Sequence, residues 1–118
     1  MAAILVVDED DMVRQLMRRV LETCGHTVFT SPNGFRAMLV CEERPGALAL
    51  LVCATQLPDM LGLELARLAR SPQPTMSVLF LARASESTPM LDTLRRPVRC
   101  GELIAQVEER LRARDVSL

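Results

Sequence analysis

The fold is decided by the stretch Ala3-Ile4-Leu5-Val6-Val7-Asp8-Glu9-Asp10 near the start of the chain. Its first half is a continuous apolar run rich in β-branched residues, which is typical of a short strand buried on both faces of a parallel sheet. Its second half is acidic. We predict that residues 3–7 form the central strand of an α/β sheet. The acidic residues then follow its carboxyl end, where such sheets place their functional clefts.

The segment after this strand has the period of a helix. Between Asp11 and Cys24, apolar residues recur three or four positions apart, with charged residues between them. Asp10 or Asp11 can cap the first turn, where a negative charge suits the positive end of the helix dipole. Gly25 then ends the segment. We therefore predict a helix over residues 11–24.

Strand and helix patterns alternate along the rest of the chain. Apolar runs predict further strands at residues 26–30, 49–53, 77–81 and 91–94. Amphipathic stretches predict helices at residues 35–43, 62–70 and 102–112. In the helix at 62–70, the side chains predicted to face the core are Leu65, Leu68 and Ala69.

The connections between these segments are long enough for parallel pairing with right-handed crossovers. The predicted fold is therefore a single α/β domain over residues 1–118. Its flavodoxin-like, doubly wound parallel sheet has five strands in the order 2-1-3-4-5. This order places the functional cleft at the carboxyl ends of the first and third strands.

The composition is that of one globular domain without a metal or disulfide framework. The 118 residues are 49% hydrophobic and 25% charged, and a chain of this length buries enough surface to fold alone. The four cysteines are widely spaced, without a Cys-x-x-Cys pair, which argues against zinc and thiol redox motifs. The single histidine, His26, is predicted at the surface and is given no catalytic role.

Charge and hydropathy argue against several kinds of partner. The formal net charge of -1 provides no long-range attraction to nucleic acid or to a membrane surface, so neither is an expected partner. The sequence shows no signal-peptide pattern and no run of about 18 apolar residues that would span a bilayer. We therefore expect a cytoplasmic protein.

Three groups of residues together resemble a known family. They are Asp8 and Glu9 after the first strand, Leu57-Pro58 with the helix start at residues 62–65, and Arg96-Pro97 before the last helix. This pattern resembles the receiver domain of two-component response regulators over nearly the whole chain. The resemblance implies a signalling module that is not an enzyme. Its partners would be a histidine kinase, another receiver or an effector, with a homodimer as a further option.

A receiver takes a phosphoryl group from a histidine kinase onto an aspartate, helped by a magnesium ion held on neighbouring carboxylates. Here the phospho-acceptor position falls on Ala54, whose methyl group can neither attack phosphorus nor ligate a metal. The hydroxyl residue at the end of the fourth strand falls on Ala82, and the aromatic residue of the fifth strand falls on Thr93. The lysine before proline falls on Arg96, which keeps the positive charge as a planar fork.

The acidic pair Asp8 and Glu9 survives. Without a third carboxylate at position 54, we expect weak magnesium binding or none, and no other cofactor. Arg96 has lost its aspartate partner, and we predict that it pairs with Asp8 or Glu9 instead.

The connection between the fourth and fifth strands is short. Receiver domains have a complete helix there, whereas residues 83–90 are too few for a helix with two flanking loops and contain Pro89 without an apolar period. We predict that this fourth helix is missing or vestigial. Apolar flanks of the two strands would then need cover from the loop itself or from a partner chain.

These observations lead to one function and two alternatives. The favoured function is a phosphorylation-independent pseudo-receiver, a protein–protein interaction module in two-component-type signal transduction. The first alternative is a receiver phosphorylated at another carboxylate, Asp8 or Asp59. The second is a flavodoxin-like binder of a small ligand, against which the absence of a Gly-rich phosphate loop counts.

Overall fold

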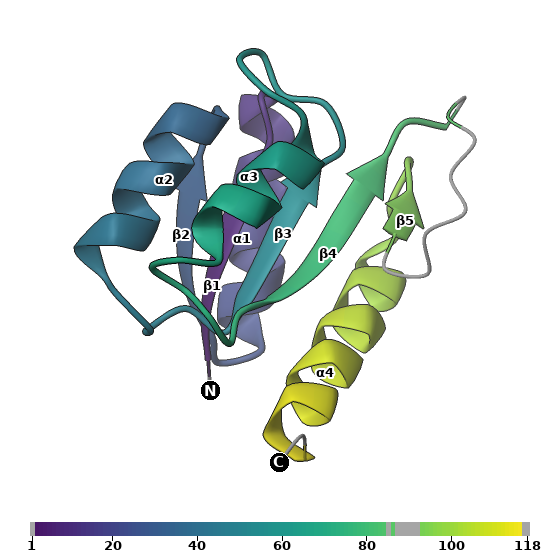
Figure 1. Cartoon of the computed structure of the whole chain (residues 1–118). Coiled ribbons are helices and arrows are strands. Elements are labelled where there is room, and N and C mark those ends of the chain that lie inside the picture. Colours follow the sequence, from purple (N-terminus) through teal and green to yellow (C-terminus); the bar gives the residue numbers. More distant parts are fainter. Residues whose placement is uncertain (1, 85, 87–92, 117–118) are drawn as a thin grey trace.

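The computed structural model describes residues 2–84, 86 and 93–116. Within them, strands and helices alternate from the start to the end of the chain (Figure 1). The strands are β1 (Ala3–Val7), β2 (Thr27–Ser31), β3 (Leu50–Ala54), β4 (Ser77–Ala82) and β5 (Thr93–Arg95). The helices are α1 (Asp11–Thr23), α2 (Gly34–Glu43), α3 (Gly62–Ala69) and α4 (Cys100–Val116).

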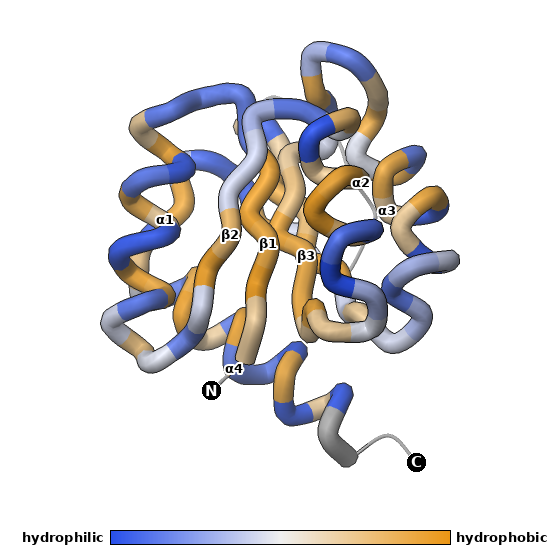
Figure 2. The backbone as a smooth tube through the Cα atoms, turned by 90° about the vertical axis from the view of Figure 1, so that its left-hand side faces the viewer, coloured by the Kyte–Doolittle hydropathy of each residue, from blue (hydrophilic) through white to orange (hydrophobic). Residues whose placement is uncertain are grey.

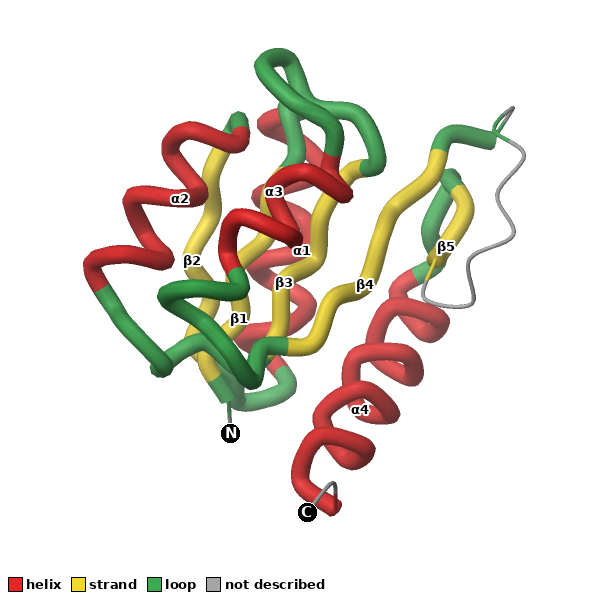
Figure 3. Tube along the Cα trace, viewed as in Figure 1, coloured by secondary structure: helices red, strands yellow, loops and turns green. Residues whose placement is uncertain are grey.

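All five strands pair in parallel in one sheet, in the order β2-β1-β3-β4-β5. The predicted doubly wound, flavodoxin-like α/β fold is therefore confirmed, with element ends that differ from the prediction by a few residues. Figure 3 shows the connections that leave β1 and β3 together at one edge of the sheet. This edge is the carboxyl end of the strands, where the sequence predicts the functional cleft.

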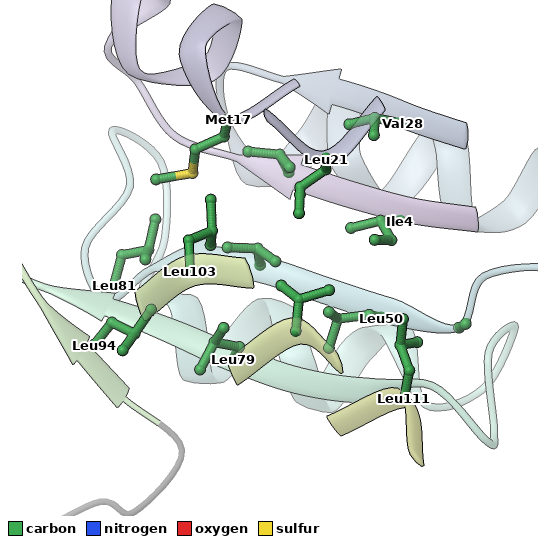
Figure 4. Packing of buried hydrophobic residues seen from close by; sticks show 14 residues of the cluster. Ile4, Met17, Leu21, Val28, Leu50, Leu79, Leu81, Leu94, Leu103 and Leu111 are labelled. Atoms are coloured by element: carbon green, nitrogen blue, oxygen red, sulfur yellow. The ribbon is translucent and has the colours of Figure 1, made fainter. Parts of the chain in front are cut away.

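The sheet is covered by helices on both faces. Ile4 and Val6 of β1 face a cluster with α1 and α4, whereas Leu5 and Val7 face a second cluster with α2 and α3. Figure 2 shows the resulting apolar strands in the centre with polar turns of α1 outside, and Figure 4 shows the packing of the first cluster. These four side chains are fully buried, as expected for a continuous apolar run.

Neighbouring residues determine where α1 begins and ends. The Asp10 carboxylate accepts hydrogen bonds from the backbone N–H of Met12 at 2.9 Å and of Val13 at 3.3 Å. Of the two aspartates considered from the sequence, Asp10 is therefore the N-cap. Beyond the helix, Gly25 has a φ of 93°, a left-handed conformation that glycine adopts without strain.

The prediction was wrong for one core residue of α3. Leu65 and Ala69 are fully buried as predicted, but Leu68 is 54% exposed. The buried stripe of this short helix also includes Gly62 and Ala66. Leu68 lies outside that stripe because it is turned by about 100° from Ala69.

Two buried polar residues have non-local roles that the sequence does not show. The Gln73 side chain accepts a hydrogen bond from Leu48 N–H at 3.0 Å and donates to the carbonyls of Cys41 at 2.9 Å and Arg44 at 2.5 Å. These hydrogen bonds connect the end of α2 to the residues that precede β3.

His26 is also buried, contrary to the prediction. The ring of His26 is buried because it lies between the residue before β1 and α4, and it contacts both. Nδ1 accepts from the backbone N–H of Ala2 at 3.2 Å, and Nε2 lies 3.1 Å from the Glu108 carboxylate on α4. The ring therefore joins the start of β2 to β1 and α4.

The prediction of a missing fourth helix concerns residues 83–90. Of these, Arg83, Ala84 and Glu86 are described, and they form a turn in which Glu86 N–H donates to the Arg83 carbonyl at 3.0 Å. Residues 85 and 87–90 lie outside the described part of the chain, so for them the missing helix stays a prediction. Within the described ranges, no helix is long and apolar enough to cross a membrane.

Candidate functional site

A pocket of about 180 Å³ lies at the carboxyl end of the sheet, between the ends of β1 and β3 and the residues that follow β4 and β5. The residues that line it are Asp8, Glu9, Asp10, Ala54, Thr55, Gln56, Leu81, Arg83 and Arg96. The structure therefore brings together the acidic pair, the phospho-acceptor position and the arginine that the sequence singled out. Ala82 and Thr93 are not among these lining residues.

Asp8 is the buried centre of this pocket, with 1% of its surface exposed. One carboxylate oxygen accepts a hydrogen bond from Asp10 N–H at 2.9 Å. The other forms an ion pair and hydrogen bond with the guanidinium of Arg96, so of the two predicted partners of Arg96, Asp8 and Glu9, the structure has Asp8. Burial of a carboxylate is costly unless it is paired and hydrogen-bonded, and both oxygens of Asp8 have such a partner.

Ala54 is the last residue of β3, and the start of α3 packs closely against it. A Cβ atom built at Gly62 would lie 2.3 Å from the Ala54 carbonyl oxygen. The same carbonyl accepts a hydrogen bond from the Cys53 thiol at 3.1 Å. Burial, with the negative charge of Asp8 as a second cause, raises the pKa of Cys53 to about 12. Cys53 therefore stays a neutral thiol, which is a poor nucleophile.

A hydrogen-bonded turn closes one side of the pocket. The Thr55 hydroxyl donates to the Glu86 carboxylate at 2.6 Å, and Arg83 N–H donates to the same oxygen at 3.2 Å. The hydrogen bond from Thr55 is the main cause that lowers the pKa of Glu86, followed by the bond from Arg83. Arg95 of β5 also donates to the backbone carbonyl of Glu86. We call this set, Thr55, Arg83, Glu86 and Arg95, the Glu86 turn.

The Glu86 turn was not predicted. Thr55 and Glu86 are 31 positions apart in the sequence, and a threonine next to the acceptor position carries no periodic signal. The available hint is that Glu86 is the acidic residue of a connection too short for a helix.

The two other positions that the sequence singled out, Ala82 and Thr93, have no side-chain hydrogen bond among the described residues. Ala82 is fully buried, and its carbonyl accepts a hydrogen bond from Arg96 N–H at 3.0 Å. Thr93 lies opposite Phe80 in the sheet. Its hydroxyl oxygen is buried and has no hydrogen-bond partner among the described residues.

Asp59 is directed at a helix end rather than at the pocket. Its two carboxylate oxygens accept hydrogen bonds from the N–H groups of Gly34 and Phe35, both at 2.9 Å. The bond from Gly34 is the main cause that lowers the pKa of Asp59. Asp59 therefore caps α2, together with Asn33, which accepts from Arg36 N–H at 2.9 Å.

The residues of the pocket do not fit the magnesium ion that a receiver would hold. The Ala54 side chain supplies no oxygen, both carboxylate oxygens of Asp8 already accept hydrogen bonds, and Glu9 is exposed. Among the residues that the structure describes, no group of three or more His, Cys, Asp or Glu side chains could hold a metal. A hard cation prefers a larger set of oxygen ligands than this pocket offers.

The sheet order and the pocket at the carboxyl ends of β1 and β3 define the class of this protein, an α/β domain of the doubly wound type. The family model of the response regulator receiver domain matches residues 4–99. The chain therefore belongs to the response regulator receiver domain family.

Individual relatives agree with this family. Response regulator MprA from Mycobacterium ulcerans (strain Agy99) is 36% identical, and the match covers 92% of this chain and 50% of MprA. MprA from Mycobacterium leprae (strain TN) has the same identity and coverage. The chain thus spans about half the length of these relatives.

Solved structures show the same fold. The receiver domain of the hybrid histidine kinase CckA matches with a TM-score of 0.83 and 28% identity over 93% of this chain and 99% of that one. A response regulator receiver domain protein from Clostridium thermocellum matches with a TM-score of 0.87 over 98% of both chains, at 19% identity.

Proposed function

We propose that this chain is a single receiver domain over residues 1–118 that works without phosphorylation, as a protein–protein interaction module in two-component-type signalling, and that it catalyses no reaction. The observation that carries the proposal is Ala54 at the phospho-acceptor position. The pocket around it supports the same reading, because Arg96 pairs with Asp8 and the site offers neither a nucleophile nor a set of metal ligands. Phosphoryl transfer depends on both.

The Glu86 turn also supports a fixed conformation. In a receiver, the hydroxyl residue at the end of the fourth strand would move to bind the phosphoryl group. Here Thr55 and the turn after β4 are joined directly by a hydrogen bond of 2.6 Å. Ala82 and Thr93 lack the hydroxyl and the aromatic ring that respond to phosphate in receivers. Partner binding would therefore depend on the shape that the chain already has.

An exposed apolar surface on α1 favours a protein partner. Met12 is 81% exposed and Leu16 is 55% exposed. Beside them a groove of about 220 Å³ separates α1 from the start of α4, and Val13, Val20 and Leu103 are among its lining residues. Exposed apolar patches of this kind mark interaction sites. The partner would be a histidine kinase, another receiver or an effector, with a second copy of this chain as a further option.

The experiment is incubation of the purified chain with acetyl phosphate and MgCl₂, followed by intact mass spectrometry. We expect no added phosphoryl group. A phosphoryl group on the wild-type chain that disappears in Asp8→Asn or Asp59→Asn would instead establish the alternative receiver. In parallel, two-hybrid pairing with histidine kinases and receivers of the same cell should give a signal for the wild-type chain that Leu16→Asp removes. Leu68→Asp, which charges an exposed leucine of α3, is the matched control and should keep the signal.

A further inference from the structure

The side of α1 that faces away from the sheet combines exposed apolar residues with charges of both signs. A hollow of about 410 Å³ lies along this side, and the described residues that line it all belong to α1. Figure 2 shows the helix along one side of the molecule. The surface is therefore formed by one helix alone, and a partner can approach it along the helix length.

The side chains of this surface form two rows along the helix. Residues four positions apart lie in one row of a helix surface. One row is apolar, with Met12 81% exposed, Leu16 55% exposed and Val20 half-buried. The other row is polar and fully on the outside, and it consists of Asp11, Gln15 and Arg19. We call these six residues the α1 face.

The two charges of the polar row lie at the surface. Asp11 pairs with Arg14 at 2.8 Å, but 74% of the Asp11 side chain is exposed, and a carboxylate can accept several hydrogen bonds. For Arg19, the structure shows no ion pair with any residue that it describes. The α1 face therefore has a negative charge at its start and a positive charge eight residues further, about 12 Å along the helix.

A second copy of α1 has the same rows in reverse order when it runs antiparallel. In a two-fold symmetric contact, residue i of one copy meets residue j of the other, and j meets i. With Gln15 opposite Gln15 of the other copy, Asp11 lies opposite Arg19 on both sides of the axis. A parallel pair would instead bring like charges together, which is unfavourable.

The apolar row has the same symmetry. With Leu16 opposite Leu16 of the other copy, Met12 lies opposite Val20. Val20 also lines the groove between α1 and the start of α4, so the long, adaptable side chain of Met12 would cover the mouth of that groove. Apolar side chains thus meet apolar ones in the antiparallel arrangement in which the opposite charges also meet.

We propose that the α1 face binds a second copy of this chain, as an antiparallel pair of α1 helices about a two-fold axis. The inference rests on the proposed function in its use of α1 as an interaction surface, and it names the partner. α1 has 13 residues and is about 20 Å long. Two such helices bury less than the ~1,200–2,000 Å² of stable complexes, so the dimer is weak, with a Kd of about 10–100 µM.

The test is sedimentation equilibrium of the whole chain from about 5 to about 500 µM, a range that brackets this Kd. We expect the mass to rise from that of a monomer towards that of a dimer. Leu16→Asp should stay monomeric, because it places two carboxylates together on the axis. Asp11→Arg and Arg19→Asp should each raise the Kd by about fivefold to thirtyfold, because each replaces two attractive contacts with two repulsive ones.

An equimolar mixture of Asp11→Arg and Arg19→Asp separates charge pairing from misfolding. In a mixed pair every altered residue meets the opposite charge, so association should return to about the wild-type level. Glu42→Arg is the matched control, since it makes the same change of charge as Asp11→Arg at an exposed position of α2. It should leave the Kd unchanged.

A chain that stays monomeric up to about 500 µM, or a mixture that associates no better than its two variants alone, would overturn the inference. A monomeric chain whose two-hybrid signal with a kinase or another receiver is lost in Leu16→Asp would assign the α1 face to that protein, and the proposed function would stand. A phosphoryl group on the wild-type chain, with the mixture associating as expected, would instead overturn the proposed function and support the dimer.

Discussion

Gly62 is the residue that lets α3 start against the end of β3. A Cβ atom at this position would lie 2.3 Å from the Ala54 carbonyl oxygen and 3.2 Å from the Cys53 sulfur. The nearest obstacle is backbone, which cannot rotate away as a side chain does. We predict that Gly62→Ala lowers the free energy of unfolding by ~1–3 kcal/mol, as other overpacked sites do.

Urea unfolding followed by circular dichroism would measure this loss. Gly101→Ala is the control, because a Cβ atom there meets nothing within 4 Å. In the first turn of α4 this change should be neutral or stabilising by up to ~1 kcal/mol. Equal stability of Gly62→Ala and the wild-type chain would show that α3 can shift away from β3.

The hydrogen bonds of the Glu86 turn lead to a prediction about the pKa of Glu86. Its hydrogen bonds favour the charged carboxylate, so the pKa of Glu86 lies below the ordinary value of about 4.3. The contribution of this group to stability is therefore complete above that value and is lost as the pH falls through the lower, folded pKa. NMR titration of the Glu86 side-chain carboxyl should show the depressed pKa, and Thr55→Val should move it upward because the hydroxyl is its main cause. An unchanged pKa in Thr55→Val would contradict the geometry of the turn.

At the scale of elements, α2 depends on a residue from another part of the chain. Asp59 accepts from the first two N–H groups of the helix, and Asn33 accepts from the N–H of Arg36. Asp59→Ala should therefore lower the free energy of unfolding at neutral pH by ~1 kcal/mol, a value typical of caps at an exposed helix end.

The pH dependence of this difference distinguishes capping from packing. Because the folded pKa of Asp59 is lowered, its contribution is complete above the ordinary value of about 3.9 and is lost as the pH falls through the folded pKa. The stability difference between Asp59→Ala and the wild-type chain should shrink there. Asp59→Asn, which keeps one acceptor oxygen, should lie between the two at neutral pH. A difference that persists unchanged in acid would assign the effect to packing instead.

The elements themselves were largely predictable, because their signals are local. The continuous apolar run of β1 predicted burial on both faces, and the period of α1 predicted the helix, with Asp10 or Asp11 as its cap. Parallel connections then left few orders for the strands. The sequence does not show which distant polar groups meet. Gln73, Asp59 and Glu86 each bond to residues 25 or more positions away, and such pairs have no period.

For the candidate site, too, the sequence predicted some contacts and missed others. Family motifs placed Asp8, Ala54 and Arg96 together, because they follow strands whose carboxyl ends share one edge. The resemblance left Arg96 without its aspartate and predicted a pair with Asp8 or Glu9, and the structure has the pair with Asp8. The Glu86 turn was not predicted, since it depends on how a short connection folds back over the end of β3. Leu68 was misplaced because a helix of two turns has a narrow buried stripe.

At the scale of the whole molecule, the two ends of the sheet have different characters. The carboxyl end has a small pocket in which Asp8 pairs with Arg96, whereas the amino end has a larger hollow whose lining includes three arginines. Both lie outside the two apolar clusters that hold the sheet and helices together. The side chains at either end can therefore change without loss of the core.

The proposed function leads to a prediction for a carboxylate placed at position 54 alone. Ala54→Asp would add a carboxylate to a pocket that already contains the buried Asp8 and a single paired arginine, Arg96. Two carboxylates that share one guanidinium repel each other, so without metal we expect a loss of ~1–2 kcal/mol in the free energy of unfolding. MgCl₂ should recover part of this loss, as measured by thermal unfolding. Ala54→Asn, whose side chain has the shape of aspartate without its charge, should not respond to the ion.

Size-exclusion chromatography with light scattering should show the same mass for Ala54→Asp with and without acetyl phosphate, because Ala82 and Thr93 still lack the groups that respond to phosphate. Phosphate-dependent dimerisation after this single change would show that the rest of the domain has kept its ability to switch.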